Sequence, residues 1–198
     1  MDFMTINQPA CLPRRRACLA LMLPLLASLG LGLPAHAIVV DAAPVLERRV
    51  KAAFLYKFLG YADFPAGSFA DATTPVSIGV VGADDMAAEL TRIAAGRLVA
   101  GRMITVRALR EQDLAQPLHV LFVAGEDNAR AARLLRAANA QLTVTECDGG
   151  LRSGSVINFT IVDDRVRFDV SLDAAEKKNL KLSSRLLTVA NRVQKGAT

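Results

Sequence analysis

The chain has 198 residues, a formal net charge of +5 and three cysteines. No internal repeat or long low-complexity segment is visible, which excludes a solenoid or other repeat architecture. The excess of basic residues is modest. Which classes of binding partner it excludes therefore depends on where those residues lie in the chain.

The first 37 residues have the pattern of an export signal. Three arginines, Arg14 to Arg16, precede an apolar and uncharged run at 17–34, and Ala35-His36-Ala37 has the small-x-small form of a signal-peptidase site. We therefore expect residues 1–37 to be a cleaved signal peptide and the mature chain to reside in the periplasm. A retained anchor is the alternative, because 18 apolar residues approach the length of a membrane helix. The adjacent arginines leave both the general secretory and the twin-arginine routes open.

Removal of this segment changes what the composition implies. Three arginines and one aspartate leave with it, so the mature chain, 38–198, has 21 basic and 18 acidic residues and a net charge of +3. Cys147 becomes the single cysteine, which excludes an intramolecular disulfide. The mature length suits one domain that buries about 70% of its unfolded surface. A weakly basic periplasmic chain gives no support to nucleic-acid binding.

Hydrophobic periodicity predicts alternating helices and strands along the mature chain. The expected helices are 44–59, 86–95, 127–140, a short one after the last strand and one that Ser183 caps, and the expected strands are 76–82, 103–109, 118–125 and 142–147. Asp84 or Asp85 is expected to cap the second helix, and Asp173 with Glu176 the fourth. Leu186, Leu187, Ala190 and Val193 are expected to share one face of the last. The pattern predicts one α/β domain, with a mixed β-sheet, a C-terminal β-hairpin and helices packed on its faces.

The segment 157–175 carries the most regular pattern. If Asp163-Asp164 forms a two-residue turn, Ile157, Phe159 and Ile161 lie opposite Val170, Phe168 and Val166. A shift by one residue would place apolar side chains against polar ones throughout, so this register is strongly favoured. The hairpin then presents one apolar face to a core and one polar face that carries Arg165, Arg167 and Asp169.

Few residues are candidates for catalysis, nucleotide binding or metal binding. His119 begins an apolar strand without partners at ligand spacing, which favours a structural role over catalysis. Cys147 lies beside Asp148, whose charge disfavours a reactive thiolate. The segment 79–82, Gly-Val-Val-Gly, lacks a full nucleotide-binding fingerprint and indicates a tight strand-to-helix turn. We therefore expect no catalytic residue, no metal site and no cofactor, and an enzyme ranks last among the function classes.

The loop 147–155 is the best candidate for a small-ligand site. Its three glycines, Gly149, Gly150 and Gly154, could turn their amides inward to bind an anion, with Arg152, Ser153 and Ser155 as additional donors. A flexible connection to the hairpin is the simpler interpretation.

Three segments together resemble one family. They are "VKAAFLYKFLGYADFP" (50–65), "GGLRSGSVINFTIVDDRVRFDVSLDAA" (149–175) and "LKLSSRLLTVA" (180–190), and they are similar to the ordered patterns of the YfiR family of exported bacterial proteins. Two departures are visible: the cysteine pairs that redox control would need are missing, and Phe64 stands where the family usually has Trp.

The resemblance implies a function. The best-known type of this family represses an inner-membrane diguanylate cyclase by binding its periplasmic sensor domain, and an outer-membrane lipoprotein can sequester the repressor. By resemblance, this chain would lower cyclic-di-GMP output and biofilm formation. The alternative is a periplasmic sensor of a small anion or other ligand that acts through another signalling partner.

Two sets of residues follow as candidate sites. The first helix has more apolar residues than one buried stripe requires. We expect a partly exposed surface formed by Phe54, Leu55, Phe58, Leu59 and Tyr61. Either a partner covers this surface or a second copy of the chain does, and the second case gives a homodimer. A ligand cleft is expected between the "YADFP" segment and the polar face of the hairpin. Its expected residues are Phe64, Arg152, Ser153, Arg167 and Asp169.

Overall fold

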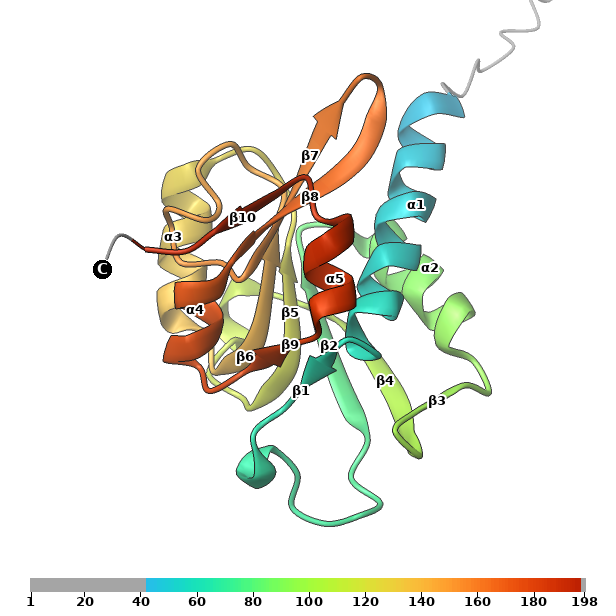
Figure 1. Ribbon diagram of the computed structural model, residues 1–198. Coiled ribbons are helices and arrows are strands. Elements are labelled where there is room, and N and C mark those ends of the chain that lie inside the picture. Colours follow the sequence, from blue (N-terminus) through green and yellow to red (C-terminus); the bar gives the residue numbers. More distant parts are fainter. Residues whose placement is uncertain (1–41, 197–198) are drawn as a thin grey trace, which may run out of the picture. The chain divides into compact units, whose positions relative to one another are not determined.

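The computed structural model describes residues 42–196, and the expected signal peptide lies outside them (Figure 1). Eight strands form one sheet in the order β10-β8-β7-β6-β5-β2-β4-β3, and β1 pairs with β9 in a separate two-stranded ribbon. The helices are α1 (Ala42–Leu59), α2 (Asp84–Ala94), α3 (Asn128–Ala137), α4 (Leu172–Lys177) and α5 (Ser184–Val189), with short 3-10 turns at Ala66–Ser68 and Glu111–Asp113. The strands are β1 (Ala62–Asp63), β2 (Val76–Val81), β3 (Leu98–Val99), β4 (Arg102–Leu109), β5 (Leu118–Val123), β6 (Ala140–Thr145), β7 (Ile157–Val162), β8 (Arg165–Ser171), β9 (Lys181–Leu182) and β10 (Arg192–Gln194).

The centre of the sheet is parallel. Strands β4, β2, β5, β6 and β7 run in one direction, whereas β8 pairs antiparallel with β7 and β3 pairs antiparallel with β4. Strand β10 pairs parallel with β8. Helix α2 connects β2 to β4 and helix α3 connects β5 to β6, and they cover opposite faces of the sheet. Central parallel strands are buried on both faces, which explains their nearly continuous apolar sequences. The predicted mixed α/β fold is confirmed.

Strand β5 separates two hydrophobic cores. Val120 and Phe122 face the core shared with α1, α2 and α5, whereas Leu121 and Val123 face the core under α3. This alternation follows from the two-residue period of a strand. The larger core lies on the α1 side, where the ribbons of α1, α2 and α5 can be seen over one face of the sheet (Figure 1).

The hairpin has the register that the sequence predicts. Phe159 lies opposite Phe168, and the flanking apolar pairs are also as expected. Asp163 and Asp164 both have positive φ, 49° and 55°. Two such residues in succession form the mirror-image turn whose twist matches that of the flanking strands. The Phe168 ring meets Phe58 of α1 edge-on, with ring centres 4.9 Å apart, so the hairpin's apolar face packs against the first helix.

The end of the chain differs from the prediction. The last helix ends at Val189, and Val193 lies in β10 rather than on the helical face. The fourth helix is capped by Ser171, whose hydroxyl accepts from the amide of Ala174, and not by the expected pair of acidic residues. Short strands such as β10 owe their conformation to the partner strand, which local propensity cannot indicate.

The expectation that Leu55 and Leu59 lie exposed on the first helix is wrong. Their exposed fractions are 0% and 2%. Helix α1 contacts α2 as well as the sheet, so it needs a wider apolar surface than a helix that packs on one neighbour. Among residues 42–196, no helix is both long and apolar enough to cross a membrane.

We predict that Leu55→Asp unfolds the domain, because an unpaired charge at a fully buried position is prohibitive. The matched variant Leu46→Asp changes a leucine of the same helix that is 63% exposed, and it should change the melting temperature by only a few degrees. Circular dichroism melting of both variants checks this. A folded Leu55→Asp protein would contradict the buried placement of α1.

Candidate functional site

A crevice lies beyond the carboxyl ends of the central strands. The connection after β2 runs over one face of the sheet to β4, and the connection after β5 runs over the other face to β6. Strands β2 and β5 are adjacent, so their loops diverge at this point. In open parallel sheets such a switch point is the usual place for ligands to bind. The crevice begins beside it, at Gly125 after β5, and extends past Glu146 after β6 to β7 and β8.

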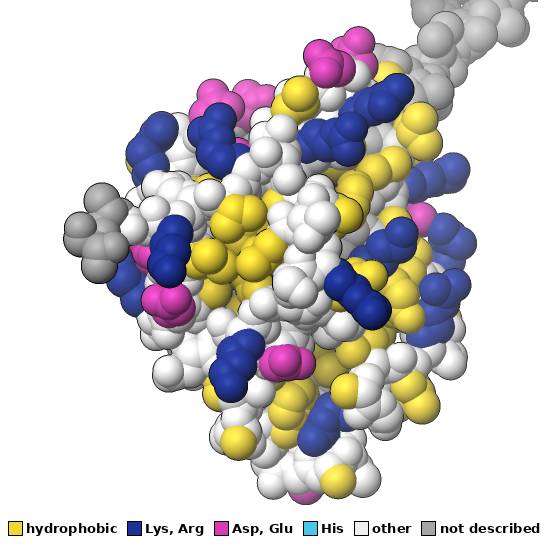
Figure 2. Space-filling model, viewed as in Figure 1, with side chains coloured by type: hydrophobic (Ala, Val, Ile, Leu, Met, Phe, Trp, Pro, Cys, Tyr) yellow, Lys and Arg dark blue, Asp and Glu magenta, His cyan; other side chains and the backbone are white. Residues whose placement is uncertain are grey.

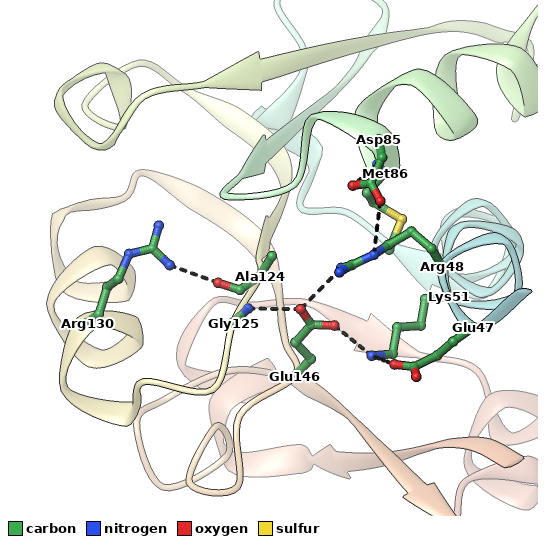
Figure 3. A network of polar contacts seen from close by, with 9 residues as sticks. All are labelled: Glu47, Arg48, Lys51, Asp85, Met86, Ala124, Gly125, Arg130 and Glu146. Carbon is green, nitrogen blue, oxygen red and sulfur yellow. Dashed lines mark hydrogen bonds and ion pairs between the residues drawn. The ribbon is translucent and has the colours of Figure 1, made fainter. Parts of the chain in front are cut away.

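The carboxylate of Glu146, just after β6, is the centre of a polar network in this crevice (Figure 3). Its Oε2 accepts a hydrogen bond of 2.7 Å from the Lys51 ammonium, and its Oε1 accepts one of 2.9 Å from the amide of Gly125 after β5. Arg48 of α1 donates to the same Oε1 at 3.3 Å and also forms an ion pair with Asp85 of α2. The network thus connects α1, α2, β5 and β6.

The two central charges of this network are withdrawn from water. The side chains of Lys51 and Glu146 are 8% and 9% exposed, and Lys51 also pairs with Glu47 one turn earlier. Burial raises the pKa of Glu146, but hydrogen bonds from Lys51 and Gly125 and the positive charges of Lys51 and Arg48 outweigh it. The net pKa is below the ordinary value, so Glu146 stays ionised near neutral pH.

The crevice has a volume of about 730 Å³, which is large enough for a small organic molecule. Phe159 and Asn158 are among its uncharged lining residues. The charged lining comprises the carboxylates of Glu47, Glu126, Glu146, Asp148 and Asp169 and the cations of Arg48, Lys51 and Arg192. Carboxylates exceed cations, so the crevice as a whole favours a ligand with a positive group over a simple anion.

An apolar groove of about 560 Å³ lies between α1 and the β7–β8 hairpin. We call this the α1–hairpin groove, and its lining residues are Ala43, Leu46, Glu47, Val50, Phe54, Ile161, Asp164, Arg165, Val166 and Arg167. Leu46 and Ile161 are 63% and 49% exposed, although most large apolar side chains of the domain are buried. An exposed apolar groove of this kind is typical of a protein-interaction surface.

The five residues expected to contact a partner have different positions. Leu55, Phe58 and Leu59 are buried in the core, so they cannot contact a partner in the folded domain. Phe54 is partly buried and lines the α1–hairpin groove, while Tyr61 is 37% exposed at the end of α1.

The five residues expected to bind a ligand are not brought together. Phe64 packs against Phe69 and His119 at the amino end of β5. Arg167 borders the α1–hairpin groove and Asp169 the crevice, both at the opposite end of the parallel strands. The expected cleft between the "YADFP" segment and the hairpin is therefore wrong.

Arg152 and Ser153 lie in the glycine-rich loop that precedes the hairpin. The amides of Gly149, Gly150 and Gly154 donate to oxygens of the protein itself, which is incompatible with the expected inward-facing anion site. The side chain of Arg152 is exposed. Ligand binding by Arg152 or Ser153 stays a prediction, without the support of the glycine amides.

His119 and Cys147 both have structural surroundings. The Nδ1 of His119 accepts from the amide of Ser77 at 3.0 Å, so its Nε2 donates to the carbonyl of Ser68 at 2.9 Å. Burial is the main cause that lowers the pKa of His119, and it also raises the pKa of the Cys147 thiol. No group of His, Cys, Asp and Glu within residues 42–196 has a geometry suited to hold a metal ion.

Sequence reasoning missed the central residues of the crevice, Lys51 and Glu146. One signal was present: Lys51 is four residues before Leu55 and shares its helical face, so a charge interrupts the buried stripe. A lysine at such a position needs an acidic partner, and residues after parallel strands are the natural source.

The fold and its two hollows define an α/β domain with two surfaces suited to binding. A model of the YfiR/HmsC-like family matches residues 48–191, and the chain belongs to that family. Proteins of this family are periplasmic and regulate diguanylate cyclase signalling. No match was found among curated proteins.

We predict that Glu146→Gln lowers the free energy of unfolding by about 2 kcal/mol, because it weakens charge-assisted hydrogen bonds at a buried position. The ionised group stabilises the fold above its ordinary pKa of 4.5, and this contribution disappears as the pH falls through the lower folded-state pKa. Urea titrations should therefore give a constant difference from wild type above pH 5 that shrinks towards pH 3.

The matched control is Glu47→Gln, which removes the more exposed acidic partner of the same lysine. Its effect should stay near 0.5 kcal/mol, as is usual for exposed ion pairs. If both variants lost the same free energy of unfolding, the burial of Glu146 would add nothing to the stability of the fold.

Proposed function

We propose that this protein represses an inner-membrane diguanylate cyclase by binding the periplasmic sensor domain of that enzyme. Repression would lower cyclic-di-GMP and, through it, biofilm formation. The observation that carries the proposal is the family match over residues 48–191, since the family regulates this signalling system. The proposal adds the mode of action, which is direct binding of the sensor domain.

The α1–hairpin groove is the surface that best fits this role. Leu46 and Ile161 lie on opposite walls of the groove, and they are 63% and 49% exposed. Apolar side chains of a sensor domain could bury them on binding, which is a usual arrangement for the centre of a protein interface. Arg165 and Arg167 lie beside the apolar lining and can form a polar rim.

Further partners follow from the same proposal. An outer-membrane lipoprotein that sequesters the repressor would compete for it with the cyclase. A second copy of the chain could also cover the α1–hairpin groove, and a homodimer of this kind would hide the surface until a partner displaced it.

Ligand sensing is a second candidate function, which the crevice favours. Its volume suits a small molecule, and Arg48, Lys51 and Glu146 offer both donors and acceptors. Glu47 and Ile161 line both the crevice and the α1–hairpin groove, so a ligand in the crevice could change partner binding. A ligand of the native state would raise the melting temperature, and a screen of amines, carboxylates and phosphates checks this.

Deletion of the gene should raise cellular cyclic-di-GMP and surface attachment, and the wild-type gene should restore both. We predict that Leu46→Glu and Ile161→Glu fail to restore them, because each change places a charge in the apolar interface and weakens binding by about 2 kcal/mol. Mass-spectrometric quantification of cyclic-di-GMP in the complemented strains measures the effect, and pull-down of the sensor domain measures binding.

Leu98→Glu is the matched control. Leu98 is also a leucine with high exposure, 57%, but it lies on β3 rather than in the groove, so the variant should repress like wild type. Unchanged cyclic-di-GMP in the deletion strain, with the cyclase expressed, would refute repression. Full repression by both groove variants would refute the groove as the docking surface.

A further inference from the structure

A second surface of α1 is strongly basic. Where α1 packs beside α2, four cations surround a shallow hollow of about 420 Å³: Arg49, Lys57, Arg92 and Arg97. We call these four the α1–α2 basic surface. Figure 2 shows dark blue side chains gathered on the right of the view, over the positions of α1 and α2 in Figure 1. Glu89 is the single acidic residue of the hollow.

Most of this charge is not neutralised within the domain. Arg92 pairs with Glu89 across one helical turn. Among the ion pairs of residues 42–196, none involves Arg49, Lys57 or Arg97, and all three side chains are exposed. Glu89 also feels the charge of Arg49, so the four cations and one carboxylate leave a net charge of +3 on this surface. Such an excess produces a positive potential that attracts anions.

The hollow between the cations is apolar and partly aromatic. Val50, Ala53 and Ile93 line it, each only partly buried, and Tyr56 lies beside them. The guanidinium of Arg97 stands 5.3 Å from the centre of the Tyr56 ring. Tyrosine next to exposed basic residues is a common composition at membrane–water interfaces, where the ring is half in an apolar phase and its hydroxyl in water.

We propose that the α1–α2 basic surface rests on an anionic phospholipid bilayer. This inference depends on the proposed function, which places the protein beside an inner-membrane enzyme. Arg49 and Lys57 are eight residues apart on α1, which separates them by about 12 Å along the helix axis. Charges spread over this distance around a shallow hollow fit several lipid headgroups rather than one enclosed anion.

The position of the surface on α1 supports the same occupant. Val50 lines both the basic hollow and the α1–hairpin groove, so the two surfaces lie on adjacent sides of one helix. A bilayer that covers the basic side leaves the groove open beside the membrane, where the sensor domain of a membrane protein is located. An acidic protein surface is the competing occupant, and the test includes it.

The test uses protein recovered from periplasmic extracts, so that no export signal contributes to lipid binding. Sedimentation with vesicles of pure phosphatidylcholine and with vesicles containing phosphatidylglycerol measures partitioning at low and high salt. We expect binding only to the phosphatidylglycerol vesicles and its loss at high salt, since the attraction acts within a Debye length. The double variant Arg49→Gln/Arg97→Gln should partition roughly 30-fold more weakly, which corresponds to about 1 kcal/mol for each charge removed.

The matched control, Arg107→Gln/Arg136→Gln, removes two exposed arginines from β4 and α3, outside the basic surface, and should bind like wild type. Melting curves establish that both double variants are folded. The proposal is overturned if the protein does not bind phosphatidylglycerol vesicles at low salt. It is also overturned if the two double variants lose the same amount of vesicle binding. Binding to a poly-glutamate peptide but not to vesicles would overturn it as well, because that result would assign the surface to an acidic protein.

The two experiments distinguish failure of the membrane inference from failure of the proposed function. If the basic surface does not bind lipid but deletion of the gene still raises cyclic-di-GMP, the proposed function stands and the membrane inference falls. If deletion leaves cyclic-di-GMP unchanged, the proposed function falls whatever the vesicles show.

Discussion

The buried pair of Lys51 and Glu146 is the interaction on which the arrangement of this domain depends. It joins the first helix to the carboxyl end of β6, and through Gly125 and Arg48 it also reaches β5 and α2. A buried charge without its partner is strongly unfavourable, so α1 has few alternative positions on the sheet. Both hollows and the basic surface are built on α1, and their shapes follow from where this pair holds it.

The position of α1 in turn explains why one helix carries three kinds of surface. Its fully buried stripe packs on the sheet and on α2, and its amino-terminal half borders the crevice on one side and the α1–hairpin groove on the other. Because Glu47 and Ile161 belong to both hollows, occupation of either one changes the surroundings of the other. If a ligand and a partner both act through this helix, as proposed, no movement of whole domains is needed to connect them.

Much of the fold could be predicted from the sequence, because its signals are local. The pairing of Phe159 with Phe168 follows from a two-residue period and a turn that aspartates permit, and α1 follows from apolar spacing. The candidate site was harder to predict from the sequence. Nothing local relates Lys51 to Glu146, since 95 residues separate them and only the topology of the sheet brings them together. The error over Leu55 and Leu59 has the same origin: the sequence indicates a wide apolar surface, but not that α2 covers part of it.

The last strand has a consequence for the order in which the chain can fold. Strand β10 pairs with β8, and β9 pairs with β1, so residues at the end of the chain complete ladders that begin much earlier. Until residues 181–194 are present, β8 has an unpaired edge and α5 does not cover the core. Exposed strand edges and apolar surface promote aggregation of incomplete chains. We therefore expect the domain to fold only after residues 181–194 have been synthesised, and chains shortened at the carboxyl end to accumulate as aggregates rather than as a smaller stable domain.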